Sequence, residues 1–74
     1  MQRIEAEFEE KCHKLVQSEM WEKLEVAAVE HLDLKKGKSA RAFFFLGIAL
    51  YRMEYFDQAA IAFSKSSEMK PDDA

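Results

Sequence analysis

Apolar residues recur every three or four positions along most of the chain, which is the spacing of one face of an α-helix. In residues 2–17 this apolar stripe consists of Ile4, Phe8, Cys12 and Leu15. Glutamates are concentrated in the first half of the segment and lysines in the second half, a distribution that the helix dipole favours. The pattern predicts a first amphipathic helix over residues 2–17, followed by a short break at Ser18 and Glu19.

A second helix is predicted from about Met20 to Lys35. Its apolar face consists of Trp21, Leu24, Ala28 and Leu32, with Val29 beside them. The sequence Lys-Lys-Gly-Lys at residues 35–38 marks its end, because cations stabilise the last carbonyl groups and Gly37 suits a left-handed C-terminal cap. Ser39 then stands where a third helix needs an N-cap residue.

The third helix is predicted to run from Ala40 to about Met53. The fourth starts near Phe56 or Asp57 and ends before Pro71, which interrupts helical hydrogen bonding. Short connections make successive helices antiparallel neighbours. We therefore expect an all-α fold in which two helical hairpins, of about residues 2–38 and 40–73, stack into a single domain over residues 1–74.

Residues 40–73 resemble a tetratricopeptide (TPR) repeat. Within about 34 residues the family pattern has a bulky aromatic, Leu-Gly, a large residue, Ala, an aromatic, a small residue and a closing Pro. The matching positions are Phe43, Leu46, Gly47, Ala59, Phe63 and Pro71. Phe43 replaces the usual Trp, Leu50 the usual Tyr and Ser66 the usual Ala. The resemblance implies a TPR-like α-α superhelix.

The first hairpin is interpreted as a degenerate copy of this repeat at about residues 5–39. The offset is 35 positions, as from Phe8 to Phe43. It also pairs Cys12 with Gly47, Leu24 with Ala59 and Ala28 with Phe63. The last two pairs exchange a large and a small residue, which can conserve packing volume. Two unrelated capping helices are the alternative.

Small residues at Gly47 and Ala59 are expected to form the contact point of the second hairpin. The surrounding space would be filled by Phe43, Leu46, Leu50 and Phe63. A glycine inside a helix costs about 0.5–1 kcal/mol relative to alanine, so Gly47 indicates a packing requirement. We assign these residues no chemistry.

In TPR proteins the first helix of each repeat lines a concave groove that receives a peptide or a helix of a partner. The resemblance implies that Phe44, Ile48 and Tyr51 face this groove, with Arg41 and Arg52 at its ends. Phe45 faces either the groove or the neighbouring hairpin. TPR domains that bind acidic C-terminal tails use Lys and Asn where Phe44 and Ile48 stand, so an apolar partner segment is expected instead. The alternative is that these residues pack against the first hairpin or a second copy.

Composition limits the functional classes. The chain has 74 residues, of which 49% are hydrophobic and 34% charged, as in a single globular domain. A net charge of −3 with interspersed signs gives no basis for nucleic-acid binding. A single cysteine excludes an internal disulfide and favours a reducing, cytoplasmic location. No apolar run approaches the about 18 residues of a membrane span, so no membrane insertion is expected.

Catalytic and metal-binding patterns are weak. Cys12 and His13 are adjacent and point about 100° apart on a helix, and His31 is distant in sequence, so no metal ligand set is expected. A buried thiol and a surface imidazole are the preferred interpretation. The N-terminal glutamates are interpreted as a solvated helix start rather than an acid/base pair. We therefore expect no enzyme activity and no cofactor.

The sequence favours a protein–protein interaction module of the adaptor, co-chaperone or assembly-scaffold type. The alternative is a structural homo-oligomerisation unit that uses the same apolar residues. One period beyond Ala40 lies Ala74, so the chain ends at a repeat boundary. Two repeats are fewer than such arrays usually need, which is consistent with an excised segment, a self-paired chain or a subunit stabilised by another protein. The isolated chain is expected to be marginally stable or self-associated, which a monomer with a high cooperative melting temperature would contradict.

Overall fold

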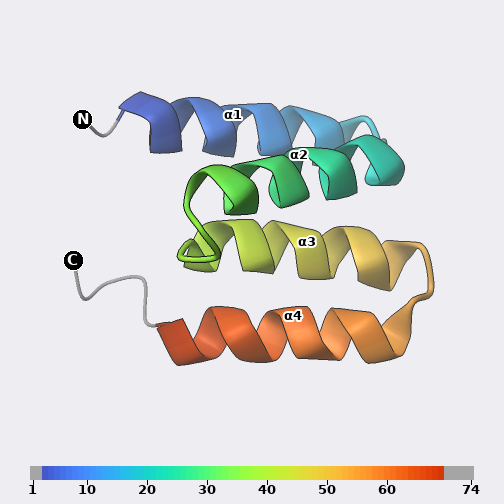
Figure 1. Ribbon diagram of the computed structural model, residues 1–74. Coiled ribbons are helices and arrows are strands. Elements are labelled where there is room, and N and C mark those ends of the chain that lie inside the picture. Colours follow the sequence, from blue (N-terminus) through green and yellow to red (C-terminus); the bar gives the residue numbers. More distant parts are fainter. Residues whose placement is uncertain (1–2, 70–74) are drawn as a thin grey trace.

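The computed structural model describes residues 3–69, with side chains from Ala6 onward, and all of the secondary structure in this range is helical. The elements are α1 (Arg3–Gln17), α2 (Trp21–Leu34), α3 (Ala40–Arg52) and α4 (Phe56–Met69). They lie next to one another in chain order (Figure 1), and α3 has the most extensive contacts because it packs against both α2 and α4. The predicted all-α fold with four helices is confirmed. The side chain of Ile4, and Pro71 with its neighbours, lie outside the described residues.

Ser39 caps the start of α3 as predicted. Its backbone is extended, with φ −140°, and its side-chain oxygen accepts a hydrogen bond of 3.2 Å from the Ala42 N–H. This bond satisfies one of the N–H groups that the first turn of a helix leaves without a partner.

Helices α1, α2 and α3 end with the same hydrogen-bond pattern. After α1, the Met20 N–H donates to the Leu15 carbonyl at 2.9 Å and the Glu19 N–H donates to the Val16 carbonyl at 3.0 Å. The corresponding bonds after α2 join Gly37 to Leu32 and Lys36 to Asp33, and those after α3 join Tyr55 to Leu50 and Glu54 to Tyr51. This is the Schellman motif. Gly37 is left-handed as predicted, with φ 76°, and the left-handed backbone begins one residue earlier, at Lys36.

The backbone repeats with the offset of 35 positions. Helices α2 and α4 both have 14 residues and start 35 positions apart, at Trp21 and Phe56. Helices α1 and α3 end at Gln17 and Arg52, again 35 apart. The left-handed residues Glu19 and Glu54 occupy equivalent positions in the two turns. Helical residues 5–17 and 21–34 therefore have helical equivalents 35 positions later, at residues 40–52 and 56–69.

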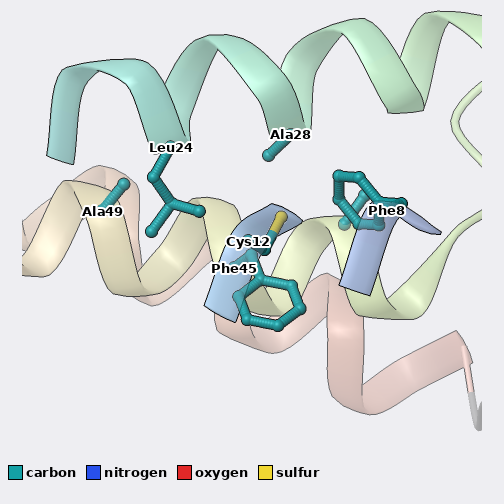
Figure 2. Close-up of a cluster of buried hydrophobic side chains, with 7 residues drawn as sticks. Phe8, Cys12, Leu24, Ala28, Phe45 and Ala49 are labelled. Carbon is teal, nitrogen blue, oxygen red and sulfur yellow. The ribbon is translucent and has the colours of Figure 1, made fainter. Parts of the chain in front are cut away.

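The main core joins three helices (Figure 2). It consists of Phe8 and Cys12 from α1, Leu24 and Ala28 from α2, and Ala42, Phe45 and Ala49 from α3. A smaller cluster between α3 and α4 contains Leu50, Ala59 and Ala62, with Leu46, Met53 and Phe63 packed against it. The first cluster holds the two hairpins together, and the second closes the α3–α4 hairpin.

Gly47 of α3 lies against the Phe63 ring of α4. A Cβ atom at this position would stand 2.7 Å from Cε1 of the Phe63 ring. The neighbour that requires the glycine is therefore an aromatic ring, while Ala59 is buried in the smaller cluster.

The buried face of α2 differs from the predicted face at one edge. Val29 is 44% exposed, whereas Ala27 and His31 are buried. Val29 lies about 140° around the helix from Leu24, so it points away from the core once Leu24 points inward. The His31 ring instead stacks on Phe8, with centroids 3.9 Å apart and an interplanar angle of 7°.

Candidate protein-binding groove

An apolar groove of about 460 Å³ lies between α1 and α3 and reaches the end of α4. We call it the α1/α3 groove. It is lined by Glu9, His13 and Val16 of α1, by Ala40, Arg41, Phe44, Phe45 and Ile48 of α3, and by Ser66 of α4. Its two long sides are formed by the first helix of each hairpin.

Phe45 links the groove to the core. Its side chain is only 5% exposed and belongs to the main core cluster. Its ring meets Phe8 and His13 edge to face, with centroid distances of 5.9 and 5.6 Å. Phe45 therefore lines the groove and contacts the first hairpin at the same time. The sequence predicted one or the other of these two orientations, and the structure combines them.

Phe44 supplies the exposed apolar surface of the groove. It is 48% exposed, and its ring contacts Phe45 at 5.8 Å and Phe63 at 5.9 Å between centroids. Val16 and Ile48 are half-buried and pack against the main core. The apolar surface of the groove is thus fixed from behind by close-packed side chains.

The charges at the rim neutralise each other. Arg41 Nε lies 2.9 Å from Glu9 Oε2, and both side chains are substantially exposed. An exposed ion pair of this kind contributes little to stability, about 0–1 kcal/mol. Its main effect here is to leave the groove without a net charge from these two residues.

Ser66 ties α4 to the start of α3. Its hydroxyl donates a hydrogen bond of 2.9 Å to the Ala40 carbonyl. The donor of this side chain is therefore already used within the protein.

Four of the six residues predicted to bind a partner line the groove: Arg41, Phe44, Phe45 and Ile48. The other two do not. Tyr51 is 56% exposed and meets the Phe56 ring at 5.3 Å, and the Arg52 guanidinium lies 5.3 Å from the centroid of the Trp21 ring. Both residues stand at the α3–α4 turn, beyond the end of the groove.

The three groove residues of α1 were not predicted from the sequence. Glu9, His13 and Val16 are the 35-position equivalents of Phe44, Ile48 and Tyr51, the residues expected to face the groove from the third helix. The 35-position repeat could therefore have identified the groove residues of α1 from the sequence. Two of the three are polar, so their hydrophobicity alone did not indicate a binding surface.

Cys12 is a buried structural thiol, as predicted. It is fully buried, and burial raises the pKa of the thiol to about 11, so the reactive thiolate is disfavoured. His13 is exposed, as predicted. Among residues 3–69, no cluster of three or more His, Cys, Asp or Glu residues is placed to hold a metal ion.

None of the helices in this part of the chain combines the length and the apolar character that crossing a membrane requires.

A scan against protein-family models found no match to the chain, and searches of curated proteins and of solved structures found none either. The resemblance of residues 40–73 to a TPR repeat therefore stays a prediction from the sequence.

Proposed function

We propose that the chain is a protein–protein interaction module, of the adaptor or scaffold type, that binds an amphipathic helix of another protein in the α1/α3 groove. The observation that carries this proposal is the exposed apolar surface of Phe44 inside a groove of about 460 Å³, beside Val16 and Ile48. Contiguous apolar surface that a folded domain leaves exposed is typical of a binding site.

A helix fits this groove better than an extended peptide. An extended segment brings backbone N–H and C=O groups that need hydrogen-bond partners. Arg41 is engaged with Glu9, and the Ser66 hydroxyl donates to Ala40, so the groove offers few free partners. A helix satisfies its own backbone and needs only a complementary apolar surface.

The neutral rim favours an uncharged contact face on the partner. Because Arg41 and Glu9 already neutralise each other, neither a strongly acidic nor a strongly basic segment gains net attraction from this pair. Binding is therefore expected to change little between low and physiological salt, unlike binding that depends on charge steering.

The test uses helical peptides selected from a display library, with affinities measured by calorimetry. Phe44→Gln and Val16→Gln should each weaken binding about tenfold, since each replaces apolar surface of the groove by a polar side chain. Phe56→Gln is the matched control, because Phe56 is 54% exposed, close to the 48% of Phe44, but lies outside the groove. Binders that tolerate both groove substitutions would refute the proposal.

The alternative function is a structural unit that self-associates through the same groove. Light scattering over a range of concentrations distinguishes the two. A dimer that Phe44→Gln dissociates and Phe56→Gln leaves intact would assign the groove to self-contact. If the wild-type chain and both variants are monomeric, the groove is available to a different protein.

A further inference from the structure

Exposed Phe and Tyr side chains lie on the second hairpin only, within the part of the chain that the structure describes. Phe44, Tyr51, Tyr55 and Phe56 are 48 to 56% exposed. In the first hairpin Phe8 is buried and Trp21 is half-buried. The equivalents of these four residues in the first hairpin are Glu9, Val16, Met20 and Trp21, of which only Trp21 is aromatic. The second hairpin therefore carries aromatic side chains at positions where the first is mostly polar or aliphatic.

Helix α3 covers the first hairpin. The Arg52 guanidinium lies over the Trp21 ring, and Phe45 packs edge to face against Phe8. Met53, just after α3, packs against the same core cluster as Trp21. Phe8 and Trp21 of the first hairpin are thus both contacted by the next helix in the chain.

The equivalent face of the second hairpin is partly open, since Phe44 and Phe56 are about half exposed while Phe43 and Ile48 are half-buried. Four residues of the first hairpin, Phe8, Glu9, His13 and Trp21, contact α3 through rings or an ion pair. Their equivalents, 35 positions later, are Phe43, Phe44, Ile48 and Phe56, which we call the terminal face. All four are apolar, and no described helix occupies the position that α3 holds relative to the first hairpin.

We propose that the terminal face docks an amphipathic helix in the position equivalent to that of α3. This second binding surface goes beyond the α1/α3 groove, with which it shares Phe44 and Ile48 as a border. The contacts of α3 define the chemistry of the occupant. It has small residues where α3 has Ala42 and Ala49, and a large apolar residue where α3 has Phe45.

Two further positions of the occupant follow from the equivalences. Where α3 has Arg41 facing Glu9, the occupant faces Phe44, so an apolar side chain replaces the arginine. Where α3 has Arg52 over Trp21, the occupant places a cation over Phe56, a cation–π contact in the same position.

A second copy of the chain does not meet these requirements through its own first helix. Thirty-five positions before Ala42, Phe45 and Ala49 of α3 stand Glu7, Glu10 and Lys14 of α1. Head-to-tail stacking would place these charges against the aromatic side chains of the terminal face. Their desolvation has no compensating partner there, so the occupant is a helix of different sequence.

The test uses a peptide copy of residues 38–54 that retains the face with which α3 covers the first hairpin. Leu50→Glu keeps it soluble, since this leucine packs in the cluster between α3 and α4, and Arg41→Leu adapts it to Phe44. The control peptide carries Phe45→Glu in addition. Each peptide is titrated into the isotope-labelled chain and followed by NMR.

We expect the largest NMR chemical-shift changes around Phe43 and Phe56. Binding should be about tenfold weaker for the Phe56→Gln chain and for the control peptide. Phe56→Leu, which keeps an apolar side chain, should bind more tightly than Phe56→Gln. Val16→Gln, which alters the groove only, should leave binding unchanged, so this test can fail independently of the groove proposal.

Three results would overturn the proposal. The first is equal binding by the two peptides or by the Phe56→Gln chain. The second is a set of chemical-shift changes confined to α2, because this would mean that the peptide displaces α3. The third is a concentration-dependent dimer that Phe56→Gln dissociates, which assigns the terminal face to a second copy.

Discussion

Phe45 serves both the core and the groove, and this double role explains which substitutions test function. Its ring packs against Phe8 in the interior and lines the groove with its remaining surface. Removing a buried aromatic costs about 3–5 kcal/mol, a large part of the stability of a small domain. Phe44 and Val16 are better probes, because they contribute groove surface with less burial.

Gly47 allows α3 and α4 to approach. Alanine at this position would place its Cβ 2.7 Å from the Phe63 ring. We expect Gly47→Ala to lower the free energy of unfolding by about 1 kcal/mol, because overpacking costs about 1–3 kcal/mol and the gain in helix propensity returns about 1 kcal/mol. Urea denaturation followed by circular dichroism measures the change.

The Phe63→Leu background provides the control for Gly47. A smaller side chain there removes the atoms that a Cβ would meet, so Gly47→Ala should be neutral or stabilising in this background. An equal loss in both backgrounds would mean that the ring contact is not the cause.

At the scale of the elements, the helix ends are more uniform than the helix faces. Three helices close with a Schellman motif, and in each the left-handed position carries a charged residue with a side chain, Glu19, Lys36 or Glu54. Glycine is the residue that usually occupies this position, because a left-handed backbone costs other residues about 1–2 kcal/mol. The turns therefore contain strain that a substitution can relieve.

Glu19→Gly and Glu54→Gly should each raise the free energy of unfolding by about 0.5–1 kcal/mol. The relief of left-handed strain exceeds the extra entropy that glycine gives the unfolded chain. Thermal and urea unfolding measure the effect, and the double variant should be close to additive because the turns are separate.

Glu22→Gly is the matched control for these turns. Glu22 is an exposed glutamate in the first turn of α2, where the backbone is helical, so glycine should lower stability by up to about 1 kcal/mol. If all three substitutions destabilised the chain, left-handed strain in the turns would be excluded.

At the scale of the whole molecule, the sequence predicted the elements and one side of the groove. The three- and four-residue spacing of apolar positions located all four helices, and Ser39 located the start of α3. His31 lies seven positions after Leu24, a helical spacing that is consistent with its burial. Histidine is less often buried than aliphatic residues, so the residue type did not predict this burial. The stacking of His31 on Phe8 depends on how α1 packs against α2, which a single helix does not reveal.

The groove residues also fall into those that the sequence of one helix predicts and those that depend on packing between helices. Phe44 and Ile48 were predicted because the resemblance to a TPR repeat implies that the first helix of a repeat lines a groove. Glu9 and His13 contribute to the site through their position opposite α3, a tertiary relationship that periodicity within one helix does not contain. The 35-position repeat does contain this relationship. Subtracting 35 from the residues predicted to line the groove in the second hairpin gives the groove residues of the first hairpin.

Cys12 connects the stability of the whole molecule to pH. The thiol lies in the cluster that joins α1, α2 and α3, and burial raises its pKa to about 11 from an ordinary value of 9.0. Between these two values the unfolded chain loses the thiol proton while the folded chain keeps it, so the folded state is destabilised as pH rises. This contribution is fully present below about pH 9 and is lost progressively toward pH 11, by about 2–3 kcal/mol in total.

Comparison with Cys12→Ala isolates this effect from the lysines and tyrosines that titrate in the same range. At pH 8 the variant should be less stable by about 1 kcal/mol, because a small buried group is lost. As pH approaches 11 the wild-type chain should lose more stability than the variant, so that the difference closes and then reverses. Parallel curves of unfolding free energy against pH for the two proteins would show that the thiol ionises as readily in the folded chain as in the unfolded one, and the packing of the three-helix cluster around Cys12 would have to be looser than its full burial indicates.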